Sequence, residues 1–279
     1  MAQILDGKKT AEKINQQTKQ RVEEFGKPIT LVTVYDQNDA GSQFYIGMKH
    51  KKATELGINT KEILVTENDT TESVLQTIKE LNNDDSVTSI LVQSPMPNNI
   101  DQKEIFAAIA PNKDADGLSV INQGALFENS GFFIPPATPA GVMRLLDEYD
   151  IDVEQKMVAV VGRSVLFGRP MSALLVNANA SVSMLHRYTT ADQLDIALKN
   201  ADIVIVAVGI PNFIKQHQIK EGAVVVDVGA NKVDGKMVGD VDFESVSQKA
   251  SFITPVPGGV GPMTIATLLS QVVDLAKEN

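Results

Sequence analysis

Short apolar runs alternate with longer amphipathic stretches along most of the chain. The short runs are rich in β-branched residues, as parallel strands buried on both faces are. The longer stretches repeat apolar residues at helical spacing. We expect strands at 29–35, 62–65, 88–93, 158–161, 182–186, 203–208, 223–228 and 252–254. We expect helices at 10–25, 42–56, 70–81, 101–109, 138–149, 171–177, 191–200, 243–250 and 265–275. This alternation predicts an α/β fold with mainly parallel sheets.

A proline-rich segment divides the pattern into two domains. Residues 132–139, FFIPPATP, have no helical period, and domain boundaries often fall in such proline-rich stretches. We expect residues 1–137 to form one α/β domain, which the C-terminal helix 264–279 completes. Residues 138–263 are expected to form a second domain around a Rossmann-type doubly wound parallel sheet.

Composition narrows the chemistry. The 279 residues include no cysteine, which excludes disulfides, thiolate metal ligands and thiol catalysis and fits a cytoplasmic protein. The three histidines, His50, His186 and His217, lie too far apart to resemble a zinc motif. No apolar run of membrane-spanning length and no export signal is recognisable. The net charge of −10 argues against a nucleic-acid partner, and any site for an anion must be locally positive.

The stretch 158–170, VAVVGRSVLFGRP, reads as a strand, a tight turn and a helix start. Gly162 allows a sharp turn and a close approach of backbone to a ligand. Gly168 and Pro170 open a helix whose N-terminal N–H groups can bind a phosphate. The spacing G-x-S-x-x-x-G differs from the usual dinucleotide fingerprint. We favour a dinucleotide site here over an ordinary strand-to-helix turn.

The end of the next strand bears on cofactor choice. Folds that bind NAD usually place an acidic residue about twenty residues beyond the first glycine. Here the string is His186-Arg187-Tyr188-Thr189. An arginine can bind a ribose phosphate with two hydrogen bonds, whereas a carboxylate would repel it. We therefore favour NADP over NAD, with Arg187 as a plain surface residue the alternative.

The first half of the chain holds four isolated candidates for chemistry. Tyr45 and Lys49 lie one helical turn apart and share a helix face. Gln93 ends an apolar strand, where open α/β sheets bind ligands. Asp116 lies in the turn PNKDADG. Each has an ordinary alternative, respectively a solvated helix face, a strand-end amide facing water and a turn residue.

Five ordered strings then point to one family. They are YIGMK (45–49), ILVQSPMP (90–97), PNKDADG (111–117), VVGRSVLFGRP (160–170) and ITPVPGGVGPMT (253–264). Together they resemble the bifunctional methylenetetrahydrofolate dehydrogenase/cyclohydrolase family over essentially the whole chain. The resemblance implies two α/β domains with a cleft between them, a folate-binding catalytic domain and an NADP-binding domain. It also implies a cytoplasmic homodimer that acts on tetrahydrofolate derivatives, in one-carbon metabolism and purine biosynthesis.

The resemblance also assigns roles to the candidates. It implies that Lys49 is the catalytic acid/base, that Tyr45 positions the folate, that Gln93 supports Lys49, and that Asp116 binds the pterin. The implied NADP-binding residues are Gly162, Arg163, Ser164, Arg187 and Ala230. The implied loop over the folate consists of Pro257, Gly258, Gly259, Val260 and Gly261. Ser94, Ala115, Ala137 and Ala230 depart from the residues common in the family.

The implied chemistry is an oxidation followed by a hydrolysis. A hydride leaves the one-carbon bridge of 5,10-methylenetetrahydrofolate, and water then opens the methenyl cation to 10-formyltetrahydrofolate. Lysine acts as a base only when neutral, so the site must favour the uncharged amine. Three alternatives stay open on the sequence: a dehydrogenase without the hydrolase step, a different two-domain NADP-dependent oxidoreductase, and a non-catalytic dinucleotide sensor.

Overall fold

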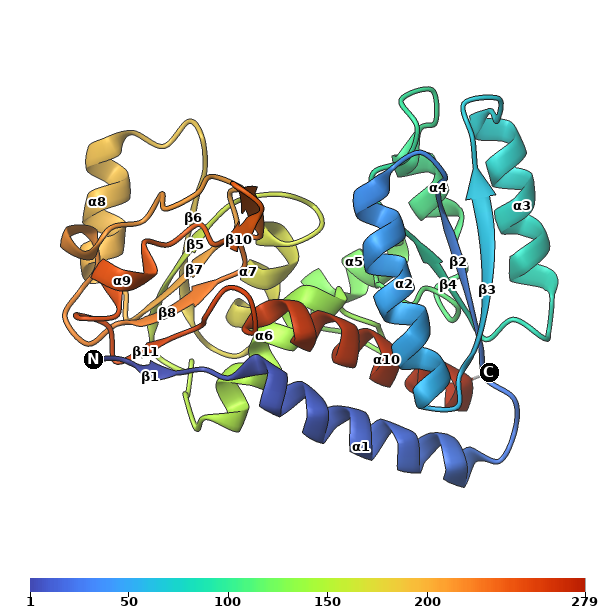
Figure 1. The fold of residues 1–279 in the computed structure, drawn as a ribbon, viewed down its shortest axis with the longest axis horizontal. Coiled ribbons are helices and arrows are strands. Elements are labelled where there is room, and N and C mark those ends of the chain that lie inside the picture. The colour runs from blue at the N-terminus through green and yellow to red at the C-terminus, as the bar shows by residue number, and fades with distance from the viewer. Residues whose placement is uncertain (279) are drawn as a thin grey trace. The chain divides into compact units, whose positions relative to one another are not determined.

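The computed structural model describes residues 1–278, with the side chains of Ala40 and Phe44 outside that description. The chain forms two compact α/β units (Figure 1). One contains residues 13–137 and the C-terminal residues from 265; we call it the three-stranded unit. The other contains residues 1–12 and 138–264; we call it the six-stranded unit.

The three-stranded unit is a small parallel sheet in the order β3-β2-β4. Its strands are β2 (Thr30–Asp36), β3 (Asn59–Val65) and β4 (Ser89–Val92). The chain leaves the central β2 for β3 on one side and returns to β4 on the other. The strand order therefore reverses between β2 and β4, and such a switch point opens a crevice at the carboxyl ends of the two strands.

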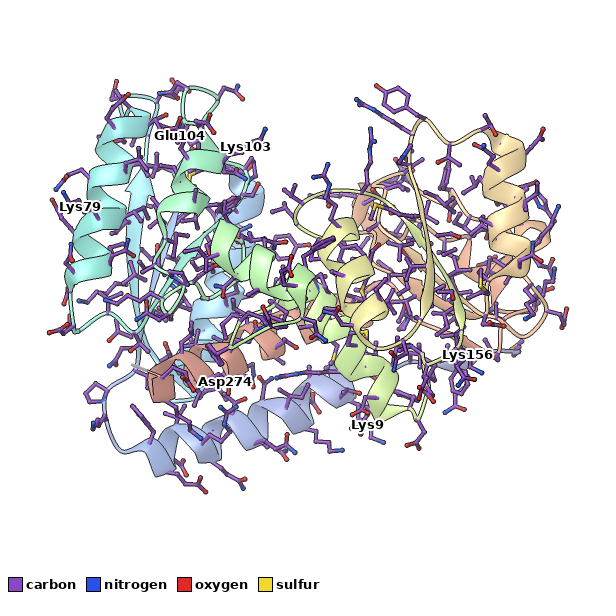
Figure 2. All side chains as sticks on the ribbon, turned by 180° about the vertical axis from the view of Figure 1, so that it is seen from behind. Lys9, Lys79, Lys103, Glu104, Lys156 and Asp274 are labelled. Carbon is purple, nitrogen blue, oxygen red and sulfur yellow. The ribbon has the colours of Figure 1, made fainter. Side chains whose placement is uncertain are left out.

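Within residues 1–278, six helices contribute to this unit. They are α1 (Gly7–Phe25), α2 (Ala40–Glu55), α3 (Thr71–Asn83), α4 (Gln102–Ala108), α5 (Val120–Glu128) and α10 (Val260–Glu278). One core cluster joins β2, α2 and α10 through the buried side chains of Leu31, Ala53, Leu56, Leu268, Leu269 and Val272. Arg21 of α1 donates to Asp274 of α10, which Figure 2 labels. Lys79 of α3 and Glu104 of α4, also labelled there, are exposed.

The six-stranded unit is an all-parallel sheet in the order β1-β11-β8-β7-β5-β6. Its strands are β1 (Gln3–Ile4), β5 (Met157–Val161), β6 (Ser181–Leu185), β7 (Ile203–Val206), β8 (Val224–Asp227) and β11 (Phe252–Ile253). From β5 the chain runs out to the edge strand β6 and returns beyond β5 to β7. Its switch point therefore lies between β5 and β7.

Helices and a hairpin complete the six-stranded unit. They are α6 (Ala137–Glu148), α7 (Gly168–Asn177), α8 (Ala191–Asn200), α9 (Phe243–Val246), the short 3₁₀ helix η1 (Gln216–Gln218) and the hairpin of β9 (Asn231–Val233) with β10 (Lys236–Val238). One face of the sheet packs Val161, Val204 and Val225 against Leu198 of α8. Alternation along the strands sends Val160 to the opposite face.

Apart from shifts in the ends of elements, three differences from the sequence expectations bear on the fold. Residues 1–12 belong to the six-stranded unit, because the two-residue strand β1 pairs with β11. Helix α5 follows the turn 111–117 where no helix was expected. Asp39, rather than the expected Ser42, is the N-cap of α2, and its carboxylate accepts from the Ser42 N–H. Within residues 1–278, no helix is both long and apolar enough to cross a membrane.

Candidate active site and cofactor site

Helix α2 turns one of its lysines inward. Lys49 is only 8% exposed, whereas Lys51 is exposed and Lys52 pairs with Glu55 on the helix surface. The Lys49 Nζ donates to Gln93 Oε1 at 2.8 Å. Burial thus separates Lys49 from two neighbours that look equivalent in sequence.

Gln93 is held at the carboxyl end of β4, beside the switch point of the three-stranded sheet. Its backbone N–H donates to the carbonyl of Val34 on β2 at 2.9 Å. Its side-chain Nε2 donates to the Ser94 carbonyl at 2.9 Å. The amide oxygen is therefore the atom that faces Lys49, and it brings no formal charge.

The turn that carries Asp116 is fixed from several sides. Its backbone adds to the edge of β4, with Ala115 donating to the Ile90 carbonyl at 3.1 Å. The buried Asp114 carboxylate accepts from the N–H of Ser119 at 2.7 Å and from Asn122 Nδ2 at 3.0 Å. These contacts leave Asp116 half-buried, with its Oδ1 accepting from the Ala137 N–H at 3.2 Å.

Gly117 closes this turn at a position where only glycine fits. Its φ is +63°, and a Cβ there would lie 2.0 Å from the carbonyl oxygen of Ile134. A side chain would therefore strain the backbone and displace the segment that contains Ile134.

Lys49 and Asp116 influence each other's protonation. Burial lowers the pKa of Lys49, although the negative charge of Asp116 raises it in part. Burial raises the pKa of Asp116 to about 6, although the Lys49 charge and the Ala137 N–H lower it and Asp114 raises it further. Both groups are thus moved toward their uncharged forms, which is the environment that proton transfer near neutral pH requires.

Tyr45 completes the set of sequence candidates in this unit. It precedes Lys49 by one turn of α2, so the two share a face of the helix. Its side chain is 40% exposed. An aromatic ring in this position can contact a ligand that approaches Lys49, since part of the ring remains accessible.

The predicted dinucleotide turn lies at the switch point of the six-stranded sheet. Gly162 follows β5 with a φ of +135°, and a Cβ there would lie 2.5 Å from the Ala207 carbonyl oxygen. A Cβ on Gly168 would lie 2.1 Å from the Gly162 carbonyl oxygen. Helix α7 begins at Gly168, and no side chain caps its N-terminus from Phe167. This close-packed turn and helix start fit the pyrophosphate of a dinucleotide.

The other predicted cofactor residues also follow strands of this sheet. Arg163 and Ser164 are exposed beyond β5, and Ser164 Oγ accepts from the Phe167 N–H at 3.1 Å. Arg187 is exposed beyond β6, and Ala230 is exposed beyond β8. The structure therefore brings these residues to the carboxyl ends of strands of one sheet.

Two buried aspartates, Asp227 and Asp240, bind the backbone beyond the carboxyl ends of β7 and β8. Neither was identified from the sequence. The Asp240 carboxylate accepts from the N–H groups of Val208 and Gly209 at 2.6 and 2.9 Å. The Asp227 carboxylate accepts from the N–H groups of Gly229, Asp240 and Val241. Burial raises the pKa of Asp227 to about 6, although those N–H groups lower it. Two aspartates near glycines after apolar strands were the available signal.

The glycine-proline loop lies in the six-stranded unit, at the start of α10, and so outside the unit that holds Lys49. The carbonyl of Gly258 accepts from the Lys8 N–H at 3.0 Å. A Cβ on Gly7 would lie 1.8 Å from the Gly259 carbonyl oxygen. The loop backbone is therefore packed tightly against the beginning of α1, as a fixed loop and not as a linker.

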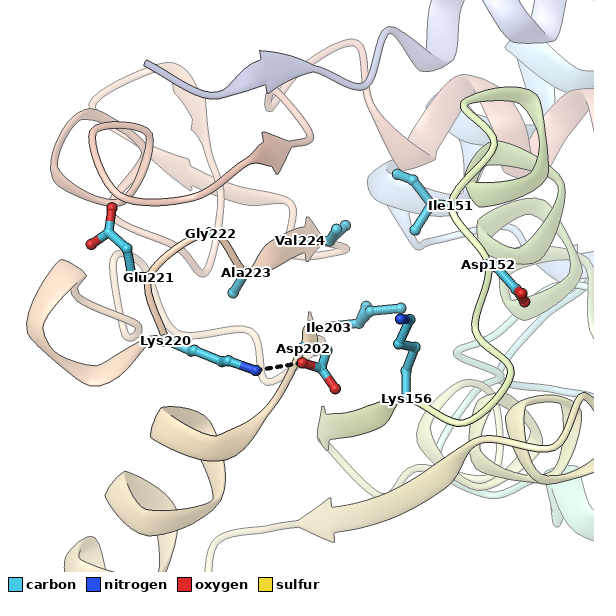
Figure 3. A pocket seen from close by; sticks show the side chains of 10 residues that line it. All are labelled: Ile151, Asp152, Lys156, Asp202, Ile203, Lys220, Glu221, Gly222, Ala223 and Val224. Carbon is cyan, nitrogen blue, oxygen red and sulfur yellow. Dashed lines mark hydrogen bonds and ion pairs between the residues drawn. The ribbon is translucent and has the colours of Figure 1, made fainter.

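The hollow drawn in Figure 3 lies at the amino ends of strands of the six-stranded sheet. It has a volume of about 260 Å³ and includes Ile203 and Val224, which begin β7 and β8. In the figure Lys220 reaches Asp202 on its wall. Ligands of such sheets bind beyond the carboxyl ends of strands, so this hollow at the amino ends is not the candidate site.

Comparison with known families covers both units. Residues 5–116 match the family model "Tetrahydrofolate dehydrogenase/cyclohydrolase, catalytic domain". Residues 136–279 match the model "Tetrahydrofolate dehydrogenase/cyclohydrolase, NAD(P)-binding domain". The two matches together span most of the chain.

Full-length relatives agree with these matches. The chain is 55% identical over 280 residues to the bifunctional protein FolD of Leuconostoc mesenteroides, which covers 100% of both chains. Its fold is similar to the crystal structure of the bifunctional FolD of Campylobacter jejuni, with a TM-score of 0.97, 43% identity and coverage of 100% and 99%. It is also similar to a Trypanosoma brucei FolD complexed with NADP and an inhibitor, with a TM-score of 0.94, 33% identity and coverage of 99% and 98%.

Proposed function

Because the chain belongs to the tetrahydrofolate dehydrogenase/cyclohydrolase family, it is a bifunctional enzyme of folate chemistry, and we propose that Lys49 moves the protons in its hydrolytic step. The enzyme has both methylenetetrahydrofolate dehydrogenase and methenyltetrahydrofolate cyclohydrolase activities.

The observation that carries the proposal is the hydrogen bond from the buried Lys49 Nζ to the amide oxygen of Gln93. A neutral amide oxygen accepts a hydrogen bond from either form of the lysine without stabilising the ammonium as a carboxylate would. The cationic methenyl substrate would lower the pKa of Lys49 further by like-charge repulsion. In its neutral form the amine accepts a proton from the attacking water, and as the ammonium it returns a proton when the ring opens.

We propose that the three-stranded unit also holds the folate. The Asp116 carboxylate can accept paired N–H bonds from the amino-pyrimidine edge of the pterin, which are stronger than neutral hydrogen bonds. The partly exposed ring of Tyr45 would position the folate beside Lys49. A folate contact by the loop of Pro257, Gly258, Gly259, Val260 and Gly261 stays a prediction from the family resemblance.

We propose NADP as the cofactor of the six-stranded unit. Gly162 and the uncapped N-terminus of α7 would hold the pyrophosphate, with Ser164 beside them. Arg163 and Arg187 would bind the ribose 2′-phosphate, and Ala230 would leave room for the planar ring. The bound cofactor supplies a hydride acceptor, and the protein contributes orientation and charge.

One spectrophotometric assay tests the hydrolytic step and the preference for NADP over NAD. With methylenetetrahydrofolate and NADP, the methenyl product should form and then decay, because one enzyme carries both steps. With NAD in place of NADP, formation should be slower. Formation without decay in the purified enzyme would contradict the hydrolytic role of the site.

A variant separates cofactor choice from turnover. Arg187→Ala should raise the KM for NADP by about tenfold, the size of a charge-assisted hydrogen bond, and leave the KM for NAD nearly unchanged. Lys199→Ala, at an exposed cation of α8, is the matched control. Equal KM values for NADP in Arg187→Ala and the parent enzyme would rule out the arginine as a phosphate ligand.

We also propose that the enzyme is a cytoplasmic homodimer that pairs through β6. This strand is an edge of the six-stranded sheet, and unpaired edges are templates for pairing with another chain. Met184 on β6 and Val176 on the adjacent α7 are 37% and 57% exposed. Light scattering should give twice the 30.1 kDa chain mass, and Met184→Lys should halve it. A monomeric parent enzyme would refute this assembly.

A further inference from the structure

The exposed ring of Tyr188 contacts both Arg163 and Arg187, which lie beyond the carboxyl ends of β5 and β6. The guanidinium carbon of Arg163 lies 5.4 Å from the centre of the Tyr188 ring, and that of Arg187 lies 4.9 Å from it. Both distances are within the range of cation–π attraction. Tyr188 itself is 67% exposed, so a large ring is held at the surface for reasons other than core packing.

The sheet register explains why these side chains meet. Val161 of β5 pairs with Leu185 of β6, and Arg163 and Arg187 each follow two residues later. The ladder extends one step further, since the Gly162 N–H donates to the Leu185 carbonyl at 2.8 Å. The two arginines thus leave equivalent positions of adjacent parallel strands at their carboxyl ends.

The turn that carries Tyr188 is itself fixed. The His186 N–H donates to Thr189 Oγ1 at 2.9 Å, and the Thr189 N–H donates to the His186 carbonyl at 2.8 Å. The Tyr188 N–H donates to His186 Nδ1 at 3.3 Å. Because the turn is hydrogen-bonded on its backbone, the direction in which Tyr188 leaves it is set before any ligand arrives.

We propose that Tyr188 is a positioning residue that holds Arg163 and Arg187 ready for the ribose 2′-phosphate and so determines the preference for NADP over NAD. Two guanidinium groups repel each other, and attraction to the same ring offsets part of that repulsion. The result is a compact positive site on a chain whose net charge is −10. A dianionic phosphate gains from such a site, whereas the free 2′-hydroxyl of NAD does not. This inference rests on the NADP site proposed above.

The test compares Tyr188→Leu with Tyr188→Phe. Loss of the ring in Tyr188→Leu should lower the NADP-to-NAD ratio of kcat/KM by about five- to tenfold, from two exposed cation–π contacts. Tyr188→Phe keeps the ring and should restore the ratio. Phe127→Leu, which removes a 77% exposed ring from α5, is the matched control and should leave the ratio unchanged.

Calorimetry with cofactor fragments identifies what the ring acts on. Tyr188→Leu should weaken the binding of adenosine 2′,5′-bisphosphate and leave the binding of AMP unchanged. Equal weakening for both fragments would mean that Tyr188 stacks on adenine, and this result would overturn the proposal. An unchanged NADP-to-NAD ratio of kcat/KM in Tyr188→Leu would mean that the arginines need no ring, and it would overturn the proposal as well.

Arg187→Ala distinguishes failure of this inference from failure of the NADP site. If Arg187→Ala leaves the NADP-to-NAD ratio unchanged, the proposed NADP site is wrong. If Arg187→Ala lowers the ratio and Tyr188→Leu does not, only this inference fails.

Discussion

Lys49→Met is expected to slow hydrolysis of methenyltetrahydrofolate by at least about a thousandfold, within the range that a positioned acid/base contributes. Methionine has a similar length and fills the buried position without an amine. Binding of NADP should stay nearly unchanged, because its proposed site lies in the other unit. Stopped-flow absorbance would show the methenyl compound persisting, and Lys52→Met on the same helix should behave as the parent enzyme. Full hydrolysis by Lys49→Met would remove Lys49 from the mechanism.

Gln93→Glu tests the same mechanism with the lysine in place. A carboxylate beside Nζ would stabilise the ammonium and raise the pKa of Lys49. Because only the neutral amine acts as the base, hydrolysis rises with pH as Lys49 loses its proton. The rising limb of the pH profile should therefore move to higher pH in Gln93→Glu. A profile that does not move would mean that the rate does not depend on Lys49 ionisation.

Asp116→Asn is expected to raise the KM for the folate by about 10- to 100-fold, the cost of losing a charged acceptor for paired N–H bonds. Asparagine keeps the shape of the side chain and its oxygen, so the Ala137 N–H retains a partner. Steady-state kinetics and fluorescence titration with a folate analogue would measure the effect. Asp85→Asn, at an exposed carboxylate of the same unit, should leave the KM unchanged. An unaltered KM in Asp116→Asn would exclude the carboxylate from folate binding.

The pH dependence of folate binding carries the same signature. The pKa of Asp116 is raised to about 6, so the carboxylate is charged above that pH and protonated below it. The KM for the folate should rise as the pH falls through about 6 in the parent enzyme. Asp116→Asn should lose that dependence, because an amide does not titrate in this range.

The pattern of apolar residues was sufficient for the α/β fold, because buried parallel strands such as β5 and β7 leave a strong signal. It was insufficient for β1, since a two-residue strand has no periodicity and gains its place only by pairing with β11. Helix α5 was missed for a related reason: its surface is partly apolar, with Val120, Ile121 and Phe127 all exposed. An apolar face that turns outward breaks the usual relation between pattern and burial.

The sequence was sufficient to nominate the candidate residues, but it did not predict their environment. Lys49, Lys51 and Lys52 are indistinguishable by composition, and only the tertiary structure buries the first of them against Gln93. The strand order was equally hidden. Switch points depend on which strands become neighbours, and the sequence states only the order in which they are made. The carboxylates of Asp227 and Asp240 were missed because most of their partners are backbone N–H groups, which carry no residue signature.

The interleaving of the two units has a consequence for how the protein is made. The boundaries at 12, 137 and 264 mean that no continuous gene segment encodes either unit. A ribosome that has released residues 13–137 has yet to synthesise Leu268, Leu269 and Val272, which fill that unit's core. The nascent chain therefore exposes apolar surface of the three-stranded unit until α10 has been synthesised, and such surface attracts chaperones. A premature stop codon just before α10 would for the same reason remove these three core side chains from the three-stranded unit.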